Sequence, residues 1–362
     1  MAVVTFLIGN GFDLACGLKS KFTDTYNGYV STESSSCIVS QFKKTIEKDI
    51  KSWADFEMRM AEYAKTFNNE NELAECVEDY SAYLDSYLLQ EQKDFNDSYE
   101  ATEELARSLR MEIGDSLFNF YKGLTPKDTR AIASALSDGV RRQYRFICFN
   151  YTDIFEKLVS EVFSNGEINI FSERECISKP TLHIHGKLGE DLVLGVDNEF
   201  QMSGLPYELN SRGRRAIIKP VFLEDYDDYR KKQADSFIQE SNVICVFGLS
   251  LGDSDLSWRN ALAEWIAKDK NNHLVYYSHD LSSRTYLSSA AGRKMADEEH
   301  YKAWLIEKLF GEKNVEKDLA KTLNAQIHIP VGKTIFNINA AKYGAMVMKM
   351  KKQEINNTLK VQ

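Results

Sequence analysis

The sequence predicts an α/β fold: a mostly parallel sheet with helices on both faces and an inserted all-helical subdomain. Four short, almost wholly apolar runs are separated by helical patterns, as is typical of strands buried on both faces. Three of these runs end directly in a glycine or polar loop. From residue 40 to 124 proline and glycine are nearly absent, and apolar residues recur at helical spacing.

The runs predicted to be strands cover residues 3–8, 144–149, 243–247 and 274–277, and weaker candidates cover 181–184 and 192–194. In open α/β sheets, ligands bind outside the carboxyl ends of the strands. The first three strands end in loops at residues 9–11, 150–153 and 248–250. We therefore expect these loops to form one shared site.

The rest of the chain divides by its apolar pattern. Residues 40–124 predict several long amphipathic helices, with apolar residues at positions 42, 46, 50, 53, 56 and 60. Thr125-Pro126 closes that block and opens a short helix, and residues 303–310 predict a late helix. We expect an α/β core from residues 1–39 and 125–310, a helical insert at 40–124 and a C-terminal extension at 311–362. Lys349, Lys351 and Lys352 make that extension locally basic.

Composition narrows the function classes. The 362 residues are 43% hydrophobic and 27% charged, and 45 Lys+Arg against 54 Asp+Glu give a net charge of −9. This balance argues against a broad electrostatic grip on nucleic acid, although residues 212–215 form a short basic cluster. The six cysteines include no Cys-x-x-Cys pair, and no apolar run approaches the length of about 20 residues that spans a bilayer. We expect a cytoplasmic protein with no membrane partner.

The first motif follows the first strand and contains Gly9, Asn10, Gly11, Asp13 and Gly17. Glycines at such a turn let the backbone approach a phosphate, and the following helix N-terminus offers free N–H groups. Asp13 would repel a phosphate unless it faces a ribose hydroxyl or a base. The alternative is a plain strand-to-helix turn.

The second motif is Asn150-Tyr151-Thr152-Asp153. Asn150 is suited to orient a ribose hydroxyl or an attacking water. Asp153 is suited to accept a proton, and the alternative is that it only caps the next helix.

The third motif is His183-Ile184-His185-Gly186. On a strand the two histidines would share one face, and the glycine would give a ligand access to His185. A histidine is a natural general base at cellular pH, so His185 is the predicted base. The alternatives are a structural histidine and a metal ligand, but no partner cluster for a metal is evident.

The fourth motif, residues 248–255, places Gly248 and Ser250 after a buried strand, suited to a ribose or phosphate. We expect Asp253 or Asp255 to cap the helix that follows, and Asp255 is also a candidate ligand contact. Gly332-Lys333-Thr334 resembles the end of a phosphate-binding loop, but the first glycine of that pattern is missing.

In order, residues 8–13, 150–152, 183–186 and 248–251 resemble the AbiH family of bacterial phage abortive-infection proteins. Residues 53–57 are similar to a further segment of that family. The resemblance covers roughly residues 1–310 and implies a role in antiphage defence, with a phage-derived trigger and assembly into a homo-oligomer as its expected partners.

The same order is similar to the Rossmann-like core of sirtuins, which bind NAD. Their glycine loop matches Gly9, Gly11 and Gly17, and their catalytic His-Gly matches His185-Gly186. Their Asn-x-Asp matches at Asn150 and their ribose loop at residues 248–250. Asp13 stands where sirtuins carry Ser, and Thr152 stands where they carry Asp.

The resemblance implies a nucleotide ligand, NAD as substrate, and hydrolysis of its nicotinamide N-glycosidic bond without a metal. His185, Asn150 and Asp153 would be catalytic. The remaining motif residues would bind the ligand: Gly9, Asn10, Gly11, Asp13, Gly17, Thr152, Gly248, Ser250 and Asp255. The helical insert would act as a gate or assembly surface. Two alternatives remain open, a non-catalytic nucleotide sensor and a metal-dependent nuclease that uses Asp13, Glu57 or Asp153.

Overall fold

A computed structural model describes residues 1–137, 141–164, 168–172, 175–190, 192–225, 229–277, 290–311, 316–330 and 334–338. Gly332, Lys333 and the basic positions 349, 351 and 352 of the expected extension lie outside the described residues. No helix within the described residues is long and apolar enough to cross a membrane.

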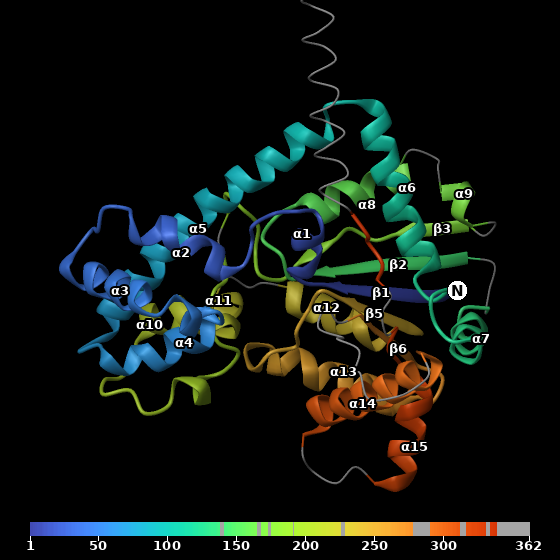
Figure 1. The fold of residues 1–362 in the computed structure, drawn as a ribbon. Helices are drawn as coiled ribbons and strands as arrows, with labels where there is room; N and C mark the ends of the chain where they lie inside the picture. The colour runs from blue at the N-terminus through green and yellow to red at the C-terminus, as the bar shows by residue number, and fades with distance from the viewer. Residues whose placement is uncertain are drawn as a thin grey trace, which may run out of the picture.

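The centre of the molecule is a parallel sheet in the order β3-β2-β1-β5-β6-β7, with β4 also paired to β2 (Figure 1). The α/β fold and all four strong strands are confirmed. The strand bounds are β1 (Ala2–Ile8), β2 (Arg141–Cys148), β3 (Glu175–Ser178), β4 (Leu182–His183), β5 (Val243–Phe247), β6 (His273–Tyr277) and β7 (Ile327–His328).

The two weaker strand candidates have different outcomes. Residues 181–184 contain β4, but residues 192–194 form no strand, so that expectation was wrong. The Val193 N–H donates to the His185 carbonyl at 2.9 Å, and an isolated bridge joins Val196 to Ile218 just after this run. Leu192 and Leu194 instead pack in an apolar cluster formed largely by helices.

Helices cover both faces of the sheet. Alternate residues of β1 point to opposite sides, since Phe6 and Ile8 join one apolar cluster and Leu7 joins the other. The first face is covered by α6 (Glu103–Asn119), α7 (Pro126–Ala135) and α8 (Ile154–Ser164). The second is covered by α12 (Arg230–Gln239), α13 (Leu256–Lys268), α14 (Ala290–Phe310) and α15 (Lys317–Gln326). The expected helices after Thr125 and over residues 303–310 are confirmed.

A helical lobe lies beyond the carboxyl ends of the strands, on the left in Figure 1. We use this name for α2 (Phe22–Val30), α3 (Cys37–Lys48), α4 (Phe56–Tyr63), the first half of α5 (Glu70–Tyr99) and α10 (Ser211–Ile217). These helices share one apolar cluster, which includes Phe42, Ile46 and Trp53. The cluster also takes in Leu194 and Ile217, so the lobe draws on residues inside and outside 40–124.

One long helix connects the lobe to the sheet. α5 has 30 residues, which corresponds to about 45 Å at 1.5 Å per residue. Leu73 near its start packs in the lobe, and Tyr99 at its end packs on the sheet.

The shorter elements are α1 (Gly11–Ala15), η1 (Ile50–Trp53), η2 (Ala64–Thr66), α9 (Ile168–Phe171), η3 (Glu199–Met202), α11 (Lys219–Asp225) and η4 (Asp253–Asp255).

The described part of the expected C-terminal extension belongs to the core. β7 pairs with β6 at the edge of the sheet. The buried ring of Phe336 packs against the rings of Phe6, Phe12 and Phe247.

Candidate active site at the strand ends

The loops after β1 and β5 contact each other directly. The N–H of Gly9 donates to the Phe247 carbonyl at 2.9 Å, and the N–H of Gly11 donates to the Gly248 carbonyl at 2.9 Å. A Cβ at Gly11 would lie 2.4 Å from Gly248 Cα, and Gly248 has φ +67°. Glycine is therefore needed here because two loops approach each other. The sequence predicts that this glycine loop approaches a phosphate, whereas in the structure it approaches the loop after β5. The helix that follows, α1, has only five residues.

Asp13 joins the first motif to the second. Its carboxylate accepts hydrogen bonds from Asn150 Nδ2 and Thr152 Oγ1, both at 2.8 Å. Asp13 is only 2% exposed. Burial raises the pKa of Asp13 to about 6, and the hydrogen bonds from Thr152 and Asn150 partly oppose that rise. The carboxyl therefore changes charge close to cellular pH.

Asn150 has one polar atom without a partner. Its amide nitrogen is used on Asp13, whereas its Oδ1 is buried and accepts no hydrogen bond. The residue is 4% exposed and lines a cavity. A buried acceptor without a partner is costly, so this atom is suited to accept a hydrogen bond from a bound ligand.

This cavity has a volume of about 290 Å³ and lies between the strand ends and the helical lobe. Six of the predicted site residues line it: Asn10, Asp13, Asn150, His185, Ser250 and Asp255. The other six do not: Gly9, Gly11, Gly17, Thr152, Asp153 and Gly248. We call this cavity the strand-end pocket. The lobe supplies the opposite wall with Phe22, Ala54, Asp55, Glu57, Leu84 and Leu88.

The two histidines lie in different environments. β4 ends at His183, and residues 184–185 form a turn, so the expectation that both share one strand face was wrong. His183 Nδ1 lies 3.1 Å from the Asn150 carbonyl oxygen, and its Nε2 lies 3.5 Å from Glu156 Oε2. His183 thus fits the structural alternative.

His185 lines the strand-end pocket, and its ring lies edge-on to Phe149 with centroids 5.5 Å apart. Burial, together with the positive charges of Lys219 and Arg230, lowers the pKa of His185 well below its ordinary value, while the Phe149 carbonyl opposes that fall. The imidazole is therefore neutral at cellular pH.

Asp153 lies outside the pocket lining. Its backbone N–H donates to Gln92 Oε1 at 2.8 Å, and its buried Oδ1 has no hydrogen-bond partner.

The expectation that Asp253 or Asp255 caps the next helix was wrong. Asp255 precedes α13, but its side chain makes no cap hydrogen bond. Asp197 supplies the cap from a distant segment, since its carboxylate accepts from Ser257 N at 2.6 Å and from Ser257 Oγ at 2.8 Å. The Asp255 side chain makes no cap hydrogen bond and instead lines the strand-end pocket.

Sequence reasoning missed a buried ion pair beside the pocket. Lys219 Nζ lies 2.8 Å from Glu57 Oε2, and Gly195 N donates to Glu57 Oε1 at 3.2 Å. Burial raises the pKa of Glu57, although Lys219 opposes it. In the sequence, the sign of this ion pair is a single lysine, Lys219, within the apolar run 216–222.

The loop after β5 holds a second unusual backbone position. Leu251 has φ +51° and a fully buried side chain. The left-handed region costs a non-glycine residue about 1–2 kcal/mol, and such positions cluster at ligand sites.

Within the described residues, no group of three His, Cys, Asp or Glu side chains could hold a metal ion.

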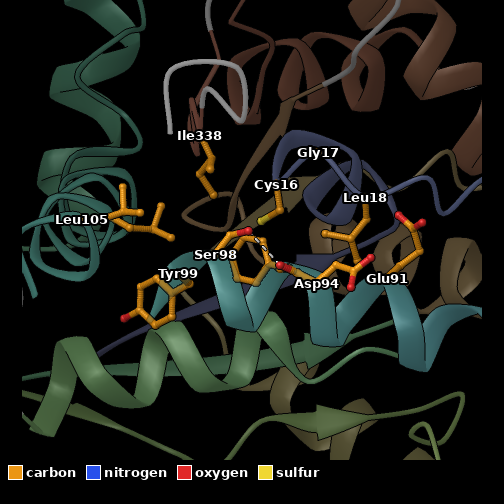
Figure 2. Close-up of a pocket in the computed structure, with 11 residues that line it drawn as sticks. Cys16, Gly17, Leu18, Glu91, Asp94, Ser98, Tyr99, Leu105 and Ile338 are labelled. Atoms are coloured by element: carbon orange, nitrogen blue, oxygen red, sulfur yellow. Dashed lines mark hydrogen bonds between the residues drawn. The ribbon is translucent and has the colours of Figure 1, made fainter. Parts of the chain in front are cut away.

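Gly17 lies at a different cavity, of about 220 Å³, which Figure 2 shows. Cys16, Gly17 and Leu18 meet α5 and α6 there, and Ile338 closes one side. Gly17 has φ +89°, which accounts for the glycine at the end of α1.

Comparison with known proteins gives a family match. The family model described as "Bacteriophage abortive infection AbiH" matches residues 5–277, which is more than half of the chain. The matched range contains every predicted site residue. No curated protein and no solved structure matches the chain.

Proposed function

The chain belongs to the AbiH family of phage abortive-infection defence proteins, and we propose that it acts by hydrolysing the nicotinamide N-glycosidic bond of NAD in the strand-end pocket. The sirtuin-like order of the motifs suggested this reaction. The observation that carries the proposal is the buried, unpartnered Asn150 Oδ1 in the pocket wall.

The residues have complementary roles in this reaction. Asn150 Oδ1 accepts a hydrogen bond from a ribose hydroxyl, and Asp13 holds the Asn150 amide in place from behind. Where ionised, Asp13 also places negative charge near the ribose as positive charge develops on its C1′.

Hydrolysis breaks one bond of NAD and forms one new bond to water. The C1′–N1 bond breaks, and nicotinamide leaves with the bonding electron pair as a neutral molecule. Water forms the new C1′–O bond, and its proton passes to the neutral imidazole of His185 and then to solvent. The products are ADP-ribose, nicotinamide and one proton.

This activity suits abortive infection, because loss of NAD stops the growth of an infected cell. The rate of NAD hydrolysis must stay low in healthy cells, so the proposal includes a phage-derived trigger that raises a low basal activity. The helical lobe is the natural place for control, since it forms one wall of the pocket.

The test is NAD consumption by the purified full-length chain. We expect the wild type to consume NAD, and Asn150→Ala and His185→Ala to lose at least about 100-fold in rate. Asn324→Ala and His300→Ala, on α15 and α14, are matched controls that keep the wild-type rate. Equal rates in all five proteins would contradict the proposal.

A non-catalytic nucleotide sensor is the second candidate. It is favoured by the engagement of both Asp13 oxygens and by the weakly basic His185. Calorimetry distinguishes the sensor from the hydrolase: NAD or ADP-ribose would bind without being consumed.

The nuclease alternative has less support. Two arginines of the basic cluster that would contact nucleic acid are paired with carboxylates, Arg212 with Glu78 and Arg214 with Glu199. DNA or RNA cleavage that EDTA abolishes would favour it.

A further inference from the structure

The strand-end pocket is lined by acidic groups. Asp13, Asp55, Glu57 and Asp255 line it, and its described lining includes no lysine or arginine. Three of these four residues are buried. In a concave site with low-dielectric walls, charges of one sign reinforce each other, so the pocket repels anions and attracts cations.

The buried lysine behind this wall does not balance the charge. Lys219 is paired with Glu57 at 2.8 Å. Burial raises the pKa of Asp255, Lys219 only partly opposes that rise, and the neighbouring Asp197 adds to it. The negative charge of Asp255 is therefore under-compensated, and a cationic ligand would supply the missing partner.

The pocket also provides apolar surface for a ring. Phe22, Phe149 and Tyr151 are part of the lining. Aromatic faces attract delocalised cations, and in the described part of the chain no group of three His, Cys, Asp or Glu side chains could hold a metal ion. The buried Asn150 Oδ1 lines the same cavity without a partner, and it is an independent sign of a polar ligand group.

The two loop glycines that the sequence predicts to hold a phosphate are otherwise engaged, and neither lines the pocket. Gly9 and Gly11 lie against Gly248, with N–H groups already bonded to the Phe247 and Gly248 carbonyls. A phosphate in the pocket would meet Asp13 and no described cationic lining residue.

We propose that the strand-end pocket binds the positively charged pyridinium riboside end of an oxidised nicotinamide nucleotide, and discriminates against the neutral dihydropyridine form through Asp255 and Asp13. The pyrophosphate would then lie outside this pocket. The inference rests on the proposed function for the identity of the ligand, but it concerns binding and needs no turnover.

The test is isothermal titration calorimetry on the full chain with two forms of one ligand. The ligand is nicotinamide riboside with CH₂ in place of the ribose ring oxygen, which prevents hydrolysis. The oxidised and dihydro forms have nearly the same shape but differ by one positive charge. We expect the wild type to bind the oxidised form at least about tenfold more tightly.

Two variants locate the effect. Asp255→Asn, and separately Asp13→Asn, should reduce the preference to about threefold or less. Asp94→Asn, in the cavity of Figure 2, should keep the wild-type preference. A full preference in both Asp255→Asn and Asp13→Asn would contradict the role assigned to these carboxylates.

The wild-type comparison decides the proposal even if a variant fails to fold. Equal affinity for the two forms, tighter binding of the dihydro form, or no binding of either at millimolar concentration would overturn it. The two claims fail separately. Preference for the oxidised form without NAD consumption would leave this inference intact and contradict hydrolysis, and consumption without preference would do the reverse.

Discussion

At the scale of single residues, Asp13 determines the charge and geometry of the site. Its carboxylate accepts one hydrogen bond from Asn150 and one from Thr152, although these residues lie more than 130 positions away in the chain. The sequence marked all three as candidates. It could not pair them, because hydrogen bonds between distant loops depend on how the strands are ordered in the sheet.

The ionisation of Asp13 gives a prediction for stability. Its pKa is about 6 in the folded protein against 3.8 for the free group. Between these values the native state binds more protons than the unfolded state, so raising the pH removes stability. The difference of about two pKa units corresponds to about 3 kcal/mol.

Urea unfolding of the wild type and Asp13→Asn at pH 4 and pH 7 measures this effect. We expect the free energy of unfolding of the wild type, relative to the variant, to fall by about 2 kcal/mol from pH 4 to pH 7, because the unfolded carboxyl is already about half ionised at pH 4. A difference that stays constant with pH would show that Asp13 has an ordinary pKa.

The histidines show how a local pattern can mislead. An i, i+2 spacing places two side chains on one face only while the strand continues. β4 stops at His183, so His185 turns into the pocket and His183 faces Glu156.

At the scale of elements, buried parallel strands were the most predictable feature. Their apolar runs are continuous, since both faces are covered. β3 was missed because it is largely exposed, and β7 was missed because it has two residues. The run at 192–194 has the composition of a strand, but Leu192 and Leu194 pack in the apolar cluster of the lobe.

The contact between the two glycine loops gives a prediction at this scale. Gly248 and Gly189 both have left-handed backbones, with φ of +67° and +76°. A Cβ at Gly248 would lie 2.5 Å from Gly11 Cα, whereas a Cβ at Gly189 would meet nothing within 4 Å. The difference in stability between Gly248→Ala and Gly189→Ala therefore measures the packing of the two loops, because both variants carry the same cost of a left-handed backbone.

We expect Gly189→Ala to cost about 1 kcal/mol and Gly248→Ala at least about 2 kcal/mol more. Chemical denaturation of both variants checks this difference. Equal costs would mean that the two loops can separate without penalty.

At the scale of the whole molecule, the sheet and the helical lobe share one pocket. The predicted helical insert at residues 40–124 is not a separable unit, because this range includes α6, whose Leu109, Ile113 and Leu117 cover the sheet. The amphipathic pattern predicted the helices of this range. It could not show that they divide between two apolar clusters.

The segment around Phe336 also stabilises the whole molecule. Phe336 is buried among rings from β1, α1 and α8. We expect Phe336→Ala to cost about 3–5 kcal/mol of unfolding free energy. Phe200 is 88% exposed, so Phe200→Ala should change stability by less than about 0.5 kcal/mol. Similar small effects of both variants in thermal unfolding would mean that Phe336 does not pack in the core.

The most direct test of the account is the NAD content of infected bacteria that carry this protein. We predict that NAD falls after infection in cells with the wild type, and that it stays level with His185→Ala, which also loses protection against the phage. Protection by the wild type while NAD remains constant would contradict the account.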